Sequence, residues 1–427
     1  MARKKTGKTT SRSGGVKSRK KTSRRSTKAA VKKAGKTARA TSRSKKGARA
    51  DRLDRANIPS LALEDFEPQI ELEEGVRDKS RGSTRFAWLG TGQCGGRLVK
   101  AFYDLGYHKA IAVNTTYHDL DDLGLPEDQK LLMDIGRKGA GKDMNRGRDA
   151  AVQYRQQIIH AVQQIFGEGV DHVMLAFGSG GGTGSGSIVS LIDTVRTCAK
   201  HMGLPNPDNS IGVLCTLPTS GEAGSPKVGS NAYRVMTELT SMAAEGKISP
   251  LIIIDNEKIR RMYPGLTVKN FWPTVNNTVA GLFDIFNRLS SLSSPYTSFD
   301  PVDYQSILHS GGCTIMGLSN VKFYKRRFDL SEAVKNNLAK TLLASGFNLE
   351  TAKVAGCIAL GGSQQMSNVA GLQDNINYAF DVLTDITGEA TIHRGVYENG
   401  KAGLRVYTII GGLDTPHERL EQLVTTV

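Results

Sequence analysis

The chain has 427 residues, of which 39% are hydrophobic, an ordinary composition for a soluble globular protein with room for two or three domains. No run approaches the roughly 20 apolar residues that cross a bilayer, so the sequence predicts no transmembrane segment. The five cysteines are scattered and include no C-x-x-C pair. This spacing argues against a disulfide framework and a structural zinc site, and it favours the reducing cytoplasm.

The net charge of +16 is concentrated at the N-terminus. Residues 1–50 contain 20 Lys and Arg and no acid, which leaves 37 basic against 41 acidic residues and a net charge of −4 for the remainder. A segment of this composition cannot bury enough apolar area to offset its ordering entropy, so we expect a disordered tail. Its charge favours DNA or another polyanion as partner; a solubilising extension and an organelle transit peptide are the alternatives. Residues 51–82 are predicted to be an acidic connector.

From residue 83 onward, short apolar runs alternate with helical periodicity. Strands are predicted at 85–89, 110–113, 130–133, 172–177, 210–215 and 251–254, and helices at 97–106, 145–166, 188–200 and 228–245. Repeated βαβ units predict an α/β fold with a doubly wound parallel sheet. We therefore expect a nucleotide-binding domain over 83–270, with its ligand at the C-terminal ends of the strands.

A long central helix is predicted over 271–296, because apolar residues recur there at helical spacing. Beyond residue 310 the alternation resumes and predicts a second, smaller α/β domain over 297–427. Its strands are expected at 313–316, 354–360, 389–393 and 404–410, and its helices at 331–344 and 368–384. Only a short polar tail is expected after the last strand.

The most informative stretch is the glycine-rich run 178–187, which follows the apolar run 172–177 and precedes a predicted helix. Residues without a β-carbon can adopt positive φ and bring backbone N–H groups together. The following helix directs the positive end of its dipole at the loop. This arrangement predicts a cradle for an anion, phosphate above all. A flexible linker is the alternative, but linkers are not framed by a buried strand and an apolar helix.

Two other glycine motifs match nucleotide-binding fingerprints incompletely. Gly90-x-Gly92-x-x-Gly95 follows a strand, as in dinucleotide-binding folds, but Asn114 stands where those folds have a ribose-binding acid. The run 136–142 matches a P-loop, except that Asp143 replaces the Ser or Thr that holds magnesium. A true P-loop is therefore not expected.

The run 180–186, Gly-Gly-Gly-Thr-Gly-Ser-Gly, resembles the signature loop of the tubulin/FtsZ superfamily, and the resemblance covers residues 84–415. Residues 92–95 are similar to tubulin's form of an earlier glycine loop, and 95–97 look like the CetZ branch; FtsZ has Asn where Arg97 stands. Residues 111–115 resemble FtsZ's next loop, and 139–141 the loop that senses the γ-phosphate. The resemblance implies that GTP or GDP, with Mg²⁺, is held by Gln93, Cys94, Gly95, Gly96, Arg97, Asn114, Gly139, Ala140, Gly141, Gly180, Gly181, Gly182, Thr183, Gly184, Ser185 and Gly186.

Further resemblances imply contacts to the ribose and the base. Glu222 is similar to the family's ribose-contacting acid, and Asn256 matches an asparagine at the end of the following strand. Trp272 falls where FtsZ has an aromatic residue that stacks on guanine, and core packing is the alternative for it. Asn276 and Asn277 fall where FtsZ has Asn-Asp, so guanine is the implied base.

The run 298–303, Ser-Phe-Asp-Pro-Val-Asp, resembles FtsZ's N-x-D-x-x-D catalytic loop, with Ser298 in place of the Asn. Carboxylates at this spacing on a turn entering a helix can project together, polarise a water and help to arrange a cation near a γ-phosphate. Asp300 and Asp303 are therefore the catalytic candidates, and a helix cap is the alternative reading of the pair. In the family this loop acts on the nucleotide of the neighbouring subunit, which implies that hydrolysis requires polymerisation.

The resemblance thus implies a cytoplasmic GTPase that polymerises head to tail with copies of itself, its last domain acting as the GTPase-activating one. Cell division or cell-shape control, as in FtsZ and CetZ, is the first role considered. A TubZ-like filament that segregates or positions DNA through residues 1–50 is the second. A relative that binds nucleotide without hydrolysing it is the third.

Overall fold

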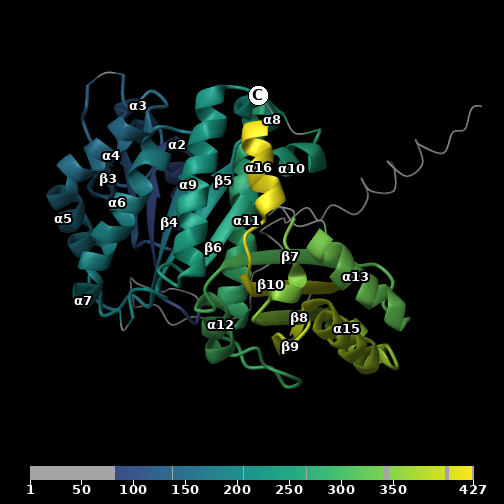
Figure 1. The fold of residues 1–427 in the computed structure, drawn as a ribbon. Helices are drawn as coiled ribbons and strands as arrows, with labels where there is room; N and C mark the ends of the chain where they lie inside the picture. Colours follow the sequence, from purple (N-terminus) through teal and green to yellow (C-terminus); the bar gives the residue numbers. More distant parts are fainter. Residues whose placement is uncertain are drawn as a thin grey trace, which may run out of the picture. The chain divides into compact units, whose positions relative to one another are not determined.

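The computed structural model describes residues 82–136, 138–204, 206–265, 267–339, 346–399 and 403–425. The predicted tail 1–50, and the connector 51–82 except for its last residue, lie outside the described residues. The described chain forms a ten-stranded sheet with helices packed against it (Figure 1). No helix in this part of the chain is both long and apolar enough to span a membrane.

Six strands form the parallel part of the sheet, as predicted. In spatial order they are β3 (Lys130–Leu132), β2 (Ala110–Asn114), β1 (Phe86–Thr91), β4 (His172–Gly178), β5 (Ile211–Leu217) and β6 (Leu251–Asp255). The order turns back between β1 and β4, which is the switch point of a doubly wound sheet. β1 and β5 are buried along their whole length, as expected for strands with helices on both faces.

The remaining strands continue the same sheet. They are β7 (Cys313–Val321), β10 (Leu404–Leu413), β8 (Val354–Gly362) and β9 (Thr391–Asn399). β10 is antiparallel to β7 and β8, whereas β9 is parallel to β8 and forms the sheet edge. β7 meets β6 through the register pair Leu251 and Cys313. The strands of both predicted domains therefore belong to one sheet.

The helices before the central one are α2 (Gly92–Asp104), α3 (Tyr117–Asp121), η2 (Glu127–Gln129), α4 (Met144–Gln153), α5 (Arg155–Ile165), α6 (Thr183–Thr197), α7 (Ala199–Met202), α8 (Ser220–Ala223), α9 (Pro226–Ala244) and α10 (Asn256–Met262). The central helix is α11 (Val268–Leu289), followed by α12 (Pro301–Leu308), α13 (Arg327–Ala339), η3 (Leu349–Thr351), α14 (Ser363–Asn368), α15 (Leu372–Thr387) and α16 (His417–Thr425). The helix predicted at 145–166 is divided into α4 and α5, and the helix predicted at 368–384 is confirmed as α15, which begins four residues later.

Two predicted boundaries were wrong because glycine is a poor helix former in isolation. The loop expected over 90–96 is largely the first turn of α2, which begins at Gly92 and not at Arg97. α6 likewise begins at Thr183, five residues before the predicted start. In both helices the glycines permit close backbone contacts: a β-carbon on Gly95 would lie 2.1 Å from the carbonyl oxygen of Ala176, and one on Gly186 2.1 Å from that of Met144.

The predicted polar tail was also wrong, because residues 417–425 form α16. Leu420 and Leu423 are buried, and the helix packs against α9. Arg419 binds the carboxylate of Asp255 at the end of β6, with Nε–Oδ2 at 2.6 Å and Nη2–Oδ1 at 3.0 Å. The apolar spacing of these leucines was the available signal for a helix.

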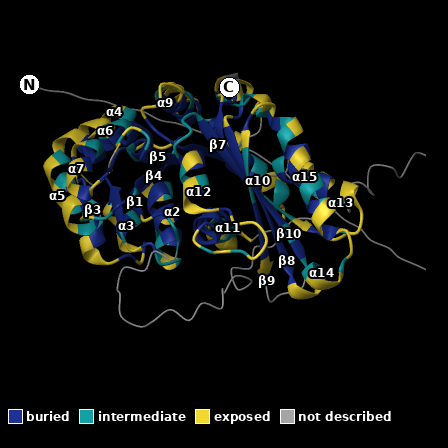
Figure 2. Cartoon of the chain, turned by 90° about the horizontal axis from the view of Figure 1, so that it is seen from below, coloured by how far each residue is buried: buried dark blue, intermediate teal, exposed yellow. Residues whose placement is uncertain are grey.

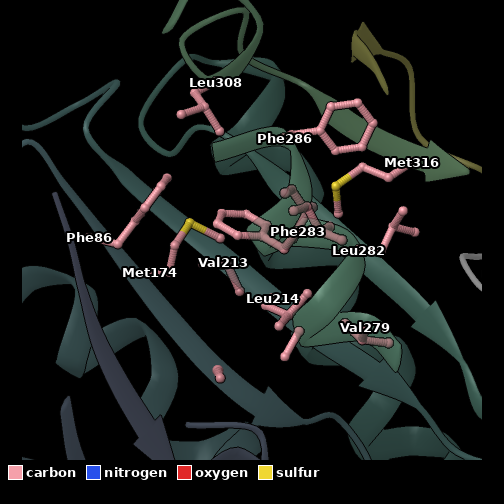
Figure 3. Close-up of a cluster of buried hydrophobic side chains, with 14 of the residues drawn as sticks. Phe86, Met174, Val213, Leu214, Val279, Leu282, Phe283, Phe286, Leu308 and Met316 are labelled. Atoms are coloured by element: carbon pink, nitrogen blue, oxygen red, sulfur yellow. The ribbon is translucent and has the colours of Figure 1, made fainter. Parts of the chain in front are cut away.

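The core runs along α11, which is buried over residues 278–289 (Figure 2). Phe283 lies edge-on to Phe86 of β1, with ring centroids 4.9 Å apart, and Phe286 approaches Tyr407 of β10 at 6.3 Å. Figure 3 shows Phe283 and Phe286 in this cluster, with Met174 of β4 nearby. Each such side chain contributes roughly 1.5–3 kcal/mol by leaving water. α11 thus joins the parallel part of the sheet to the later strands.

We predict that protonation of one buried histidine limits stability in acid. Burial lowers the pKa of His172 from 6.5 to about 3, so the native state keeps the ring neutral while the unfolded chain takes up a proton. This contribution is complete above pH 6.5 and is lost as pH falls toward 3; at pH 5 the loss is about 2 kcal/mol. Denaturant titrations should show a smaller drop between pH 7 and pH 5 in His172→Leu than in wild type. Equal drops would contradict the assignment.

Candidate functional site

A pocket of about 480 Å³ lies where the parallel strands end. Each of five neighbouring strands contributes a lining residue at or next to its C-terminal end: Thr91, Asn114, Gly178, Thr216 and Asn256. The first turn of α2, residues 140–142 and the glycine run 178–184 complete the walls on one side. The location is that expected for the ligand site of a doubly wound sheet.

The glycine run is held by its own hydroxyl groups and by close backbone contacts. Ser185 Oγ donates to the carbonyl oxygen of Ser179, and Ser179 Oγ donates to that of Thr216 at 2.8 Å. A β-carbon on Gly182 would lie 2.6 Å from the backbone nitrogen of Asp143. Only glycine therefore lets the run lie against residues 142–143.

Two helix N-termini meet at this pocket. Neither α2 nor α6 has a side-chain cap or an acidic residue in its first turn. Their first N–H groups and the positive ends of their dipoles are therefore available to an anion. Arg97 adds a full positive charge to the lining. The arrangement suits a ligand with several negatively charged groups, such as a chain of phosphates.

Cys94, in the first turn of α2, carries a neutral thiol. Its Sγ is 3.2 Å from Thr216 Oγ1. Burial raises the pKa of the thiol, while the Thr216 contact and Arg97 lower it to a smaller extent. The side chain therefore contributes shape and a weak hydrogen bond and does not serve as a nucleophile at neutral pH.

Threonine hydroxyls tie residues 139–141 to the end of β2 and to the glycine run. Thr115 Oγ1 accepts from the N–H of Ala140 at 3.1 Å and lies 2.6 Å from Thr183 Oγ1. Gly139 and Gly141 both have positive φ, which lets the chain turn back toward Thr115. Ala140 and Gly141 line the pocket.

Asp119 is a pocket residue that the sequence analysis missed. Its Oδ1 accepts from Gln93 Nε2 at 2.8 Å and its Oδ2 accepts from Asn114 Nδ2 at 3.1 Å. It thereby fixes two of the predicted ligand contacts. The signal was present, since Asp119 lies five residues after the end of a strand at the predicted crevice. In the described chain no cluster of three or more His, Cys, Asp or Glu forms a ready-made metal site.

The far side of the pocket is formed by α8, α10 and α11. Glu222 is held in a capping box, its Oε2 accepting from the N–H of Thr219 at 2.8 Å. Asn256 is buried, and its Oδ1 has no hydrogen-bond partner among the described residues. Trp272 and Asn276 line the same wall. An unpaired amide oxygen in a pocket wall is a position for a donor on a ligand.

The structure brings most of the predicted contact residues to this pocket. Those that line it are Gln93, Cys94, Arg97, Asn114, Ala140, Gly141, Gly180, Gly181, Gly182, Thr183, Gly184, Glu222, Asn256, Trp272 and Asn276. Gly95, Gly96, Gly139, Ser185, Gly186 and Asn277 are not lining residues. Asn277 is exposed, whereas its neighbour Asn276 is buried. The sequence analysis missed Thr91, Gly92, Thr116, Lys142, Gly178, Ser179, Thr216, Pro218 and Val228 as lining residues.

Asp300 and Asp303 lie away from the pocket, at the start of α12. They form a capping box: Asp300 Oδ1 accepts from the N–H of Asp303 at 2.9 Å, and Asp303 Oδ2 accepts from the N–H of Asp300 at 3.0 Å. Asp300 Oδ2 has no hydrogen-bond partner among the described residues. Within one chain, Asp300 and Asp303 therefore act as a helix cap, the alternative considered above, and one oxygen of Asp300 stays unused.

The end of α12 locates this pair relative to the sheet. The carbonyl oxygen of Leu308 accepts from Ser249 Oγ at 2.6 Å, just before β6 begins, and His309 stacks on His172 at the start of β4 with ring centroids 5.7 Å apart. α12 therefore packs at the N-terminal edge of the parallel strands. The pocket is at the opposite, C-terminal edge.

No family model matches the sequence. The tubulin-like protein CetZ of Pyrococcus abyssi is 24% identical over 332 residues, which are 76% of this chain and 84% of that protein. The tubulin-like protein TubZ of Bacillus cereus is 25% identical over 272 residues, 60% of this chain and 59% of that protein. A GTPγS-form protofilament of TubZ from Bacillus thuringiensis serovar israelensis superposes with a TM-score of 0.71 at 20% identity, covering 81% of this chain and 92% of that one.

Alanine substitutions at two neighbouring glycines test whether the pocket depends on close backbone contacts. We predict that Gly182→Ala lowers stability by about 1–3 kcal/mol, because its β-carbon would meet backbone atoms of residues 142–143. Gly181→Ala is the matched control, since the nearest atom to its β-carbon is 3.9 Å away. Thermal melts of the two variants without ligand should differ clearly. Similar melting temperatures would contradict the close contact.

Proposed function

Because this chain belongs to the tubulin/FtsZ superfamily, we propose that it binds GTP and hydrolyses it when copies assemble head to tail into a filament. One observation carries the proposal: the pocket and the free oxygen of Asp300 lie at opposite edges of the parallel strands. They cannot meet within one chain. Copies stacked in the same orientation would place the Asp300 edge of one against the pocket of the next. Such a head-to-tail contact does not close on itself and propagates into a filament.

The phosphates occupy the side of the pocket where α2 and α6 begin. Backbone N–H groups and Arg97 offset their charge. Mg²⁺ would be held on this side, because Asp119 contributes a carboxylate to the lining and oxygen is the ligand atom that Mg²⁺ prefers. When bound, the ion would neutralise charge on the phosphates. Asp119 would hold it, with Gln93 and Asn114 fixing the carboxylate.

Guanine and ribose occupy the opposite wall. Guanine presents N1–H and a 2-amino group as donors, and the unpaired Oδ1 of Asn256 and the amide of Asn276 can accept from them. Trp272 supplies a ring for stacking, and Glu222 supplies a carboxylate for ribose hydroxyls. Asn277 is exposed and lies outside the lining, so Asn276 is the stronger candidate for base recognition.

Hydrolysis follows when Asp300 of one protomer reaches the nucleotide held by its neighbour. Its unused Oδ2 can accept a proton from the attacking water and orient that water for attack on the γ-phosphorus. The helix N-termini around the phosphates stabilise the charge that develops. The same scheme assigns residues 83–270 to GTP binding and 297–427 to GTPase activation. The connecting segment predicted at 271–296 is helical only as far as Leu289, where α11 ends.

For the cellular role we propose first a cytoskeletal filament of the cytoplasm that acts in prokaryotic cell division or shape control. The similarity to CetZ supports this role. The charge of residues 1–50 supports a second candidate, a filament that segregates or positions DNA by binding it directly. The two differ in whether the tail recognises nucleic acid.

We predict that Asp300→Asn separates assembly from hydrolysis. Asn caps a helix about as well as Asp, so folding and GTP-dependent sedimentation should persist while turnover falls by about 100-fold or more. Asp385→Asn makes the same chemical change at an exposed site on α15 and should leave turnover unchanged. Undiminished turnover in Asp300→Asn filaments would remove Asp300 from the mechanism. A wild-type protein that neither sediments nor hydrolyses GTP with Mg²⁺ would overturn the function itself.

The second role predicts DNA binding that depends steeply on salt. Each neutralised phosphate should contribute about −0.9 to the slope of log affinity against log salt concentration for duplex DNA. Fluorescence anisotropy with the full chain should show this slope, and a variant lacking residues 1–50 should lose DNA binding while keeping GTP turnover. Binding that persists without the tail, or an affinity insensitive to salt, counts against a DNA-binding tail.

A further inference from the structure

His393 on the edge strand β9 lies between two side chains of α12. Its Nδ1 is 2.6 Å from Asp303 Oδ1, and its Nε2 is 3.0 Å from Ser306 Oγ. Ser306 Oγ also donates to the backbone carbonyl oxygen of Asp303 at 2.7 Å. His393 is 90 residues from Asp303 in the sequence, and no motif pointed to it.

The order Asp–His–Ser resembles a hydrolytic triad, but the hydrogen atoms are distributed differently. A hydroxyl has one hydrogen, and the carbonyl oxygen of Asp303 can only accept it. Nδ1–H can donate to Asp303, while Ser306 Oγ, whose only hydrogen goes to the carbonyl oxygen of Asp303, faces Nε2 with its lone pairs. In a nucleophilic triad the ring would instead accept the serine hydrogen. Ser306 therefore supports the ring and is not a nucleophile.

β9 also holds the backbone that leads into α12. Val396 donates its N–H to the carbonyl oxygen of Thr297 at 2.8 Å. The hydroxyl of Tyr397 accepts from the N–H of Phe299 at 2.8 Å and donates to its carbonyl oxygen at 3.1 Å. A β-carbon on Gly395 would lie 2.9 Å from that of Phe299, so the two segments are in close contact. His393 thus projects from an element that is already fixed to the Asp300 loop.

The two carboxylates of the capping box differ in how far they are engaged. Both oxygens of Asp303 are used, Oδ1 by His393 and Oδ2 by the N–H of Asp300. Asp300 uses Oδ1 for the N–H groups of Val302 and Asp303, and its Oδ2 has no partner in the described chain. Asp303 is therefore placed to orient Asp300 and not to act on the water itself.

We propose that His393 is a positioning residue for GTP hydrolysis, which fixes Asp303 so that the capping box presents Asp300 Oδ2 to the nucleotide of the neighbouring protomer. This inference rests on the proposed function. The inference gives the two predicted catalytic residues different roles. Asp300 acts on the water, and Asp303, held by His393, keeps Asp300 in place. Losing a group that orients a reacting one costs roughly 10- to 100-fold in rate.

Substitution of His393 by Asn or by Gln tests the two ring nitrogens separately, because each amide reproduces the position of only one of them. In His393→Asn the amide nitrogen takes the place of Nδ1 and can still donate to Asp303; in His393→Gln it takes the place of Nε2 and faces Ser306. The Asn variant should therefore keep kcat in filaments close to wild type, while the Gln and Ala variants lower kcat by about 10-fold or more. The GTP concentration for half-maximal rate should change less than twofold. Thr391→Ala, an exposed position two residues earlier on β9, is the matched control.

Hydrogen–deuterium exchange over residues 297–308 gives a readout that does not need turnover. The Gln and Ala variants should exchange faster there, and Asn should restore protection. Faster exchange with unchanged kcat would overturn the catalytic part of the proposal, and unchanged exchange with unchanged kcat would overturn it entirely. In the Gln and Ala variants, kcat and sedimentation could fall together while the GTP concentration for half-maximal rate rises. That result would indicate a general structural role for His393 and would also overturn the proposal. A wild type without GTP turnover would instead refute the proposed function, and exchange would still report whether His393 orders α12.

Discussion

Backbone packed directly against backbone around the end of β4 is the contact on which the pocket depends. Gly95 lies against the carbonyl oxygen of Ala176, and Gly182 and Gly186 lie against residues 142–144. A side chain at Gly95 would push α2 away from β4, and one at Gly182 or Gly186 would push the start of α6 away from the start of α4. Because the contacts are made by main chain, they place two uncapped helix N-termini at the ends of the neighbouring strands β1 and β4, with their N–H groups facing the same pocket. The hydroxyls of Ser179, Ser185 and Thr115 then fix the loops in register.

The two ends of the parallel strands differ in chemistry, with the pocket at the C-terminal ends and α12 at the N-terminal ends. α11 connects the two. Trp272 and Asn276, near the start of this helix, line the pocket, while its end leads into the segment held by β9. At 22 residues the helix is about 33 Å long. Its buried face is continuous with the core of both parts of the sheet through Phe283 and Phe286. A rigid helix of this length fixes the spacing between the pocket and the Asp300 loop.

The sequence predicted the strands and most of the pocket because their signals are local. Buried strands read as apolar runs, and residues 178–184 combine glycine with a strand before and a helix after. Helix starts at Gly92 and Thr183 were missed because the packing that overrides glycine's low helix propensity comes from residues far along the chain. The same limit applies to His393, which reaches Asp303 only through the placement of β9. Hydrophobic periodicity predicts which face of a helix or strand is buried, but it does not predict which two faces pack against each other.

The Arg419–Asp255 ion pair joins the last described helix to the wall of the pocket. Both side chains are largely buried, and Asp255 directly precedes the pocket residue Asn256. Removing α16 would leave the carboxylate of Asp255 buried without its cation, which typically costs about 3–5 kcal/mol. The C-terminal helix is therefore mechanically coupled to the ligand site. A tag or tether attached beyond α16 would pull on Arg419 and, through the ion pair, on the residue beside Asn256.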